Sequence, residues 1–158
     1  MKKMKEKNVK DLLDNKLEDF KKNFIDDLKK EYFSDNILER IIDFNDICEE
    51  AGTTEEKFMQ KCKDDHLPDH EIALRQIELI SEVLNESVEL DYDNPNQAKY
   101  EPIFRGGATG FGFSCSYSTF TFTGTYIGSR FAYVSIEKSN FSGKTFTSIY
   151  KRAIIKKK

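Results

Sequence analysis

The segments GFGFSCSYS (residues 110–118), TFTFTGTYI (119–127) and SRFAYVSI (129–136) decide the fold class of this sequence. Each segment alternates aromatic or other large side chains with small or polar ones, and a period of two in such residues is typical of β-strands. The links between the segments are short, which favours antiparallel neighbours. We therefore expect a three-stranded antiparallel meander, with Cys115 and Tyr117 on its buried face.

Helical patterns precede these strands. Residues 37–66 predict two short helices: Asp43 can cap the first and Gly52 can end it. Thr53 with Glu56 has the spacing of a capping box at the start of the second helix.

The strongest helical pattern covers residues 68–86, where Pro68 suits the first turn and apolar residues recur at spacings of three and four. Residues 88–105 contain two prolines and predict extended or irregular chain. After the strands, residues 139–155 return to helical spacing and predict a C-terminal helix. The fold class is therefore α+β: helices, then a three-stranded meander, then a closing helix.

The N-terminal part differs from the rest. Residues 5–33 place apolar side chains at helical spacings without an interrupting glycine or proline, which predicts one long amphipathic helix. We expect residues 1–36 to be a helical extension and residues 37–158 to be a single α+β domain. Within that domain, residues 37–87 are helical and residues 105–155 supply the sheet and the last helix.

The net charge of −3 conceals sectors of opposite sign. Residues 38–104 carry 18 acidic and 6 basic side chains, whereas residues 105–158 carry 9 basic side chains and 1 acidic side chain. Such asymmetry steers association and selects partners. Either the two sectors pack on each other and cancel, or one meets an outside partner: nucleic acid for the basic sector, or the basic channel of a nuclease for the acidic one.

Composition narrows the class of protein further. The three cysteines are too few and too scattered for a disulfide framework and suit a reducing compartment. The apolar runs are too short to span a membrane, and no apolar segment follows the basic N-terminus as a signal peptide requires. We expect a cytoplasmic protein without a cofactor.

Candidate chemical motifs are weak. Cys62, His66 and His70 have ligand-type side chains at spacings of four, but Pro68 separates the histidines and a fourth ligand is not evident, so we expect no metal site. The glycines of residues 106–112 lead into a strand rather than a helix, unlike a phosphate-binding loop. No nucleophile lies near a base in the sequence, so we expect no catalytic residues and no enzyme.

Several short motifs follow one another over about residues 40–152. They are Ala73-Leu74 with Leu84-Asn85-Glu86, Asp91-Tyr92-Asp93-Asn94, Lys99 to Phe104, Gly110 to Ser114, Gly128 to Phe131, and Phe146 with Tyr150-Lys151. Their order and spacing resemble a family of small accessory proteins encoded by bacteriophages and prophages. The sequence departs from the family pattern at Tyr92 and Ile103, where tryptophan is usual, and at Lys138-Ser139-Asn140, where the last helix usually opens with Glu-Leu-Ala. The family has no established activity, so the resemblance implies origin and fold and transfers no site. It also implies an accessory protein that acts in the cytoplasm of a bacterial host.

Phage origin and the acidic sector together predict binding rather than catalysis. The hypothesis is a protein that antagonises a host macromolecule, such as a defence nuclease of the CRISPR type, through contact with a host protein or ribonucleoprotein. Alternatives are a single-stranded nucleic-acid-binding module that uses the basic, aromatic C-terminal sheet, and a virion or assembly component. The candidate binding residues are Asp64, Asp65, Glu71, Glu78 and Glu82 on the acidic side, and Arg105, Arg130, Lys151 and Arg152 on the basic side.

Overall fold

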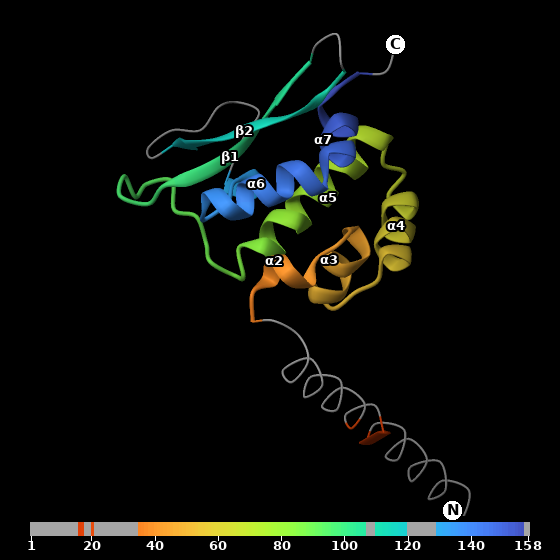
Figure 1. Cartoon of the computed structure of the whole chain (residues 1–158). Coiled ribbons are helices and arrows are strands. Elements are labelled where there is room, and N and C mark those ends of the chain that lie inside the picture. The colour runs from red at the N-terminus through yellow and green to blue at the C-terminus, as the bar shows by residue number, and fades with distance from the viewer. Residues whose placement is uncertain (1–15, 18–19, 21–34, 107–109, 120–128, 157–158) are drawn as a thin grey trace, which may run out of the picture. The chain divides into compact units, whose positions relative to one another are not determined.

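The structure is a computed structural model that describes residues 16–17, 20, 35–106, 110–119 and 129–156 (Figure 1). The chain divides into two units, residues 1–40 and 41–158, and each is described by itself. Most of the expected N-terminal helix lies outside the described residues.

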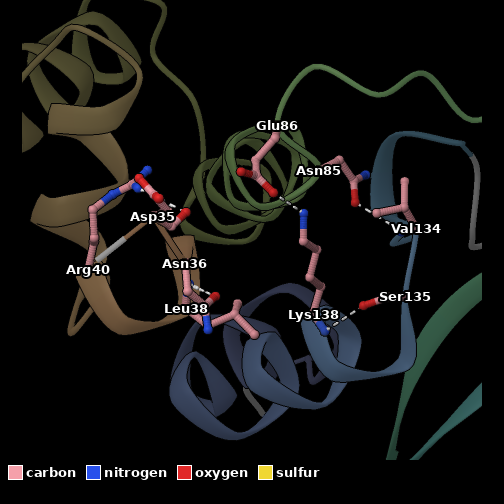
Figure 2. A network of polar contacts seen from close by, with 9 residues as sticks. All are labelled: Asp35, Asn36, Leu38, Arg40, Asn85, Glu86, Val134, Ser135 and Lys138. Carbon is pink, nitrogen blue, oxygen red and sulfur yellow. Dashed lines mark hydrogen bonds and ion pairs between the residues drawn. The ribbon is translucent and has the colours of Figure 1, made fainter. Parts of the chain in front are cut away.

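The described part of the first unit ends in a short helix, α2 (Ile37–Arg40). Local hydrogen bonds hold its start: the Leu38 N–H donates to Asn36 Oδ1 at 3.1 Å, and Arg40 Nη1 lies 3.5 Å from the Asp35 carbonyl oxygen (Figure 2). With α2, residues 37–66 contain three short helices instead of the two expected.

Helix α3 (Phe44–Glu50) begins and ends where its sequence indicates. The Asp43 carboxylate accepts from Asn45 N at 2.8 Å and from Asp46 N at 3.3 Å, and Asp46 bonds back to the Asp43 N–H. Gly52 follows the helix with φ +73°, a conformation that favours glycine. Both expectations are confirmed.

Helix α4 (Glu55–Asp64) starts one residue later than expected, because Thr54 caps it by accepting from Lys57 N. The Thr53 N–H instead donates to the Cys48 carbonyl and closes the end of α3. The capping box expected from Thr53 with Glu56 is therefore wrong, because Thr54 is the cap and the Thr53 N–H that Glu56 would bind is already donated to Cys48.

Helix α5 (Asp69–Leu84) lies at the centre of the second unit. Its buried stripe is Ala73, Ile77, Ile80 and Leu84, at spacings of four, three and four. It packs against α3 on one side and, on the other, against α7 (Thr147–Ile154) and the 3₁₀ turn η1 (Ser129–Phe131). No helix among the described residues is long and apolar enough to cross a membrane.

The described sheet has two strands, β1 (Lys99–Arg105) and β2 (Gly112–Thr119), which pair antiparallel. On the other edge of β1, Tyr100 and Tyr133 exchange two backbone hydrogen bonds as an isolated bridge. The expected strand over residues 119–127 lies, apart from Thr119, outside the described residues.

The expected strand over residues 129–136 is instead η1, the bridge at Tyr133 and the start of α6 (Ile136–Thr145). The Ser135 hydroxyl accepts from Lys138 N and begins this helix. Capping chemistry therefore ends the alternating pattern two residues after the bridge.

A β-bulge changes which side chains of β2 are buried. Ile103 pairs with Cys115 and Phe104 pairs with Phe113, so Ser114 has no partner on β1. One extra residue reverses the facing of everything beyond it. Cys115 is accordingly exposed and Tyr117 is 53% exposed, which corrects the expectation that they share a buried face.

The C-terminal helical region lies between the sheet and α5 (Figure 1). One helix was expected over residues 139–155; the chain forms α6 and α7, separated at Phe146. Helix α6 packs on both strands, and a Cβ on Gly143 would overlap the ring of Phe113 and lie 3.0 Å from the Cβ of Pro102. Glycine at this position therefore allows the helix to approach the sheet.

The hydroxyls of Tyr133, Ser142 and Tyr150 are buried and form a closed triangle of hydrogen bonds. Tyr133 Oη lies 2.6 Å from Ser142 Oγ and 2.8 Å from Tyr150 Oη, and the last two are 3.0 Å apart. Each hydroxyl can donate one hydrogen bond and accept another, so all three are satisfied within the core. Burial raises the pKa of Tyr150 to about 12 and that of Tyr133 well above its ordinary value.

Candidate interaction surface

The exposed side of α5 separates two surface grooves, and Glu78 and Glu82 line both. The first groove, about 460 Å³, lies between the C-terminal half of α5 and the chain that follows it, and Arg130 of η1 closes one side. The second groove, about 500 Å³, lies between α4 and α5. Both volumes are in the range of ordinary ligand pockets, about 300–1,000 Å³.

The second groove combines an apolar base with charges of both signs. Phe58, Cys62, Leu67 and Leu79 provide the apolar lining. Three carboxylates and three cations line the same groove: Asp65, Glu78 and Glu82, with Lys57, Lys61 and Arg75. The charges that line the second groove therefore cancel, whereas those of the first groove are mainly negative. The first groove should discriminate more strongly between positive and negative partners.

The acidic candidates from the sequence lie on two neighbouring helices. Asp64 and Asp65 are exposed at the C-terminal end of α4, and Glu71 is exposed in the first turn of α5. Glu82 is exposed one turn beyond Glu78, which is half-buried. The five candidates do not form one cluster, but Asp65, Glu78 and Glu82 share the second groove.

Two of the basic candidates are used within the chain. Arg130 pairs with Glu78 at 2.7 Å, and Arg152 pairs with Asp69 at 3.1 Å while its second nitrogen bonds Gln76. Arg105 at the end of β1 and Lys151 on α7 are exposed. Of the four basic candidates, Arg105 and Lys151 are therefore the two without an ion pair among the described residues.

A third ion pair joins the same two sectors. Lys138 of α6 pairs with Glu86 immediately after α5 (Figure 2). Together with the pairs of Arg130 and Arg152, it shows that the acidic and basic sectors are in part packed on each other, as one of the two interpretations expected. With these three carboxylates neutralised, residues 38–104 still hold 15 acidic side chains against 6 basic ones.

The aromatic residues of the C-terminal third are mostly used for packing. Phe104 stacks on Phe111 with ring centroids 5.0 Å apart and lies 4.6 Å from the Tyr150 ring. Within the described part of residues 104–150, Tyr117 is the only exposed aromatic side chain. The described sheet therefore offers little aromatic surface on which bases could stack.

Sequence reasoning did not select Asn85, which joins α5 to the chain before α6. Its Nδ2 donates to the Ala132 carbonyl at 2.9 Å, and its Oδ1 accepts from Val134 N at 3.0 Å (Figure 2). The Asn85 amide thus bonds the backbone of Ala132 and Val134, while the backbone of Tyr100 bonds that of Tyr133 between them. A helix C-cap asparagine in the sequence gives no signal of such a distant contact.

The wall of the first groove was also missed. Glu86 and Ser87 both have positive φ, +53° and +65°, and turn the chain back so that Val88, Glu89 and Leu90 line the groove opposite α5. Non-glycine residues rarely adopt this conformation, so the sequence did not indicate the turn.

The candidate metal ligands do not come together in the described residues, and the two buried thiols are not activated as nucleophiles. Cys62 is buried whereas His66 and His70 are exposed, and no group of three or more metal-ligand side chains occurs in the described part of the chain. Burial raises the pKa of Cys62, and burial together with Glu55 and Glu49 raises that of Cys48 to about 11. Both thiols are therefore protonated at neutral pH and are poor nucleophiles.

One buried carboxyl has the environment that active sites often use. Burial raises the pKa of Glu101 on β1, and its Oε1 has no hydrogen-bond partner among the described residues. Neither groove is lined by Glu101. It therefore adds nothing to the chemistry of either groove.

Comparisons with protein-family models, with curated proteins and with solved structures found no match for this chain.

Proposed function

We propose that this chain is a phage or prophage accessory protein that binds and antagonises a host macromolecule without catalysing a reaction. The target class is a defence nuclease of the CRISPR type, whose nucleic-acid channel is basic. The resemblance to small phage-encoded proteins supports the origin, and the charge of the helical half supports the kind of target.

The observation that carries the proposal is the acidic excess of residues 38–104, where 15 acidic side chains against 6 basic ones remain after internal pairing. Asp64, Asp65, Glu71 and Glu82 keep their carboxylates exposed. Carboxylates on adjacent helices attract a channel built for phosphates, and such complementarity accelerates association and selects the partner.

The geometry favours this function over binding of single-stranded nucleic acid. Arg130 and Arg152 already pair with carboxylates, and the described aromatic rings near them are mostly packed. A nucleic-acid groove needs both free cations and open rings.

The test is interference in living cells followed by isolation of the complex. A bacterium with an active CRISPR system is transformed with a targeted plasmid, with and without expression of the protein. We expect transformation to be restored, and a tagged copy to recover the effector even after nuclease treatment. Unchanged transformation with every effector type tested would contradict the proposed target class.

A matched pair of variants tests the acidic face. Asp64→Lys with Glu71→Lys should lower inhibition at least tenfold, because two attractive charges become repulsive. Asp93→Lys with Glu137→Lys makes the same change in net charge at exposed positions elsewhere, and also alters one glutamate in the first turn of a helix. Equal loss in both pairs would show that net charge alone, and not this face, is responsible.

A further inference from the structure

The first groove on α5 is lined by both carboxylates and apolar side chains. Its carboxylates are Glu78, Glu82 and Glu89, and its apolar side chains are Val88 and Leu90. Val88 is 51% exposed, so its apolar surface is accessible to a partner. A side chain that combines an apolar stem with a positive head matches this arrangement.

The groove is formed before any partner arrives. Val88 N donates to the Asn85 carbonyl at 3.0 Å, and Gln97 Nε2 donates to the Glu89 carbonyl at 3.1 Å, which ties the wall down at both ends. On the other side, the Ser81 hydroxyl donates to the Arg130 carbonyl. A preformed groove loses little conformational entropy when it binds.

The chain itself shows one cation that these carboxylates bind. The Arg130 guanidinium lies 2.7 Å from Glu78 Oε1, at the edge of the groove, with its side chain 73% exposed. Within the described residues, Glu82 and Glu89 form no ion pair. The carboxylates of Glu82 and Glu89 are therefore available to a partner, whereas that of Glu78 already binds a guanidinium.

We infer that this groove binds a segment of a partner protein in which arginines alternate with large apolar side chains. The arginine heads lie against Glu82 and Glu89, and the apolar side chains cover Val88 and Leu90. Arg130 competes with the partner for Glu78 and so limits the affinity. The inference deepens the proposed function, on which it rests for the partner being a protein.

The test uses the full chain and a labelled peptide in which two arginines alternate with leucines. Binding is followed by fluorescence anisotropy and by amide chemical shifts of the ¹⁵N-labelled protein. We expect shifts at Ser87 to Leu90 and at Arg130, and about tenfold weaker binding of the matched peptide in which neutral citrulline replaces both arginines. Shifts that lie elsewhere, or equal affinity for the two peptides, would overturn the inference.

Variants separate the groove from general attraction to the acidic helices. An exposed ion pair is worth about a factor of two to five in affinity. Glu82→Gln with Glu89→Gln should therefore weaken binding about tenfold, whereas Glu56→Gln, at an exposed position on α4 outside the groove, should leave it unchanged. Arg130→Gln should tighten binding about two- to fivefold, because it frees Glu78.

Two results refute the groove even if the peptide binds. One is an equal loss of affinity with Glu56→Gln. The other is that spermidine displaces the peptide equally well from the unsubstituted protein and from the groove variants. Spermidine carries positive charge without large apolar side chains, so such a result would mean that general charge attraction holds the peptide. If the peptide fails but inhibition in cells still depends on Asp64 and Glu71, the proposed function stands without this groove. If the peptide binds as expected but no effector is inhibited, the groove stands and the proposed target class falls.

Discussion

Replacing Asn85 with alanine should destabilise the second unit more than any exposed substitution. The amide makes two hydrogen bonds, to the Ala132 carbonyl at 2.9 Å and from Val134 N at 3.0 Å, and the asparagine is 6% exposed. A buried polar group left without its partner costs about 1–3 kcal/mol. Two such groups predict a loss of about 2–6 kcal/mol, from the 5–15 kcal/mol that is typical of a domain.

The assay is urea unfolding followed by circular dichroism. With a slope of about 1–3 kcal/mol per molar urea, the midpoint should fall by about 1–3 M. Hydrogen exchange of the Val134 amide should accelerate as well. Asn96→Ala removes the same side chain from an exposed loop position. It should change the free energy of unfolding by less than about 0.5 kcal/mol.

Asn85→Asp makes the test sharper, because it keeps the shape and removes only the donor to Ala132. The introduced carboxyl can restore that hydrogen bond only when protonated, so its pKa in the folded state should lie above its value in the unfolded chain. The contribution is therefore present below pH 4 and is lost as pH rises through the folded pKa. Relative to the unsubstituted protein at the same pH, the variant should lose less stability at pH 4 than at pH 7. A loss below about 0.5 kcal/mol for Asn85→Ala, or no pH dependence for Asn85→Asp, would refute this role of Asn85.

Three further predictions concern the packing of the sheet and its helices. Gly143→Ala should lower stability in urea unfolding even though alanine favours helices by about 1 kcal/mol, because the new methyl would overlap Phe113; a stabilised variant would contradict the close approach of α6. Stability should fall as pH rises from 10 to 12, by up to about 1.4 kcal/mol per pH unit for each of Tyr133 and Tyr150, because the unfolded chain releases these protons near pH 10 and the folded chain retains them; a constant urea midpoint over this range would be inconsistent with the hydroxyl triangle. A thiol reagent should modify Cys115 rapidly and the other two cysteines only on unfolding; protection of Cys115 would mean that the bulge does not turn it outward.

Features that depend on three or four neighbouring residues could be predicted. The cap at Asp43, the glycine after α3 and the course of α5 follow from side chains that satisfy the ends or one face of the same helix. The sign of the acidic surface was likewise predictable, because charged side chains remain at the surface wherever the helices pack.

Features that depend on distant contacts could not be predicted in this way. One unpaired residue, Ser114, reverses the facing of β2, and nothing in the alternation of the sequence marks it. The cap at Ser135 begins a helix inside a strand-like pattern. The candidate surface also needed tertiary information, since Arg130 and Glu78 are 52 residues apart and the pair decides that one basic candidate belongs to an acidic groove.

The sequence by itself determined the α+β class, the ends of α3, the course of α5 and the division of charge between residues 38–104 and 105–158, because these depend on local periodicity, capping and composition. Only the tertiary structure decided which charges cancel, which aromatic rings are packed and where the grooves lie. These depend on pairings across tens of residues, in which a one-residue bulge or a single buried amide outweighs the local pattern.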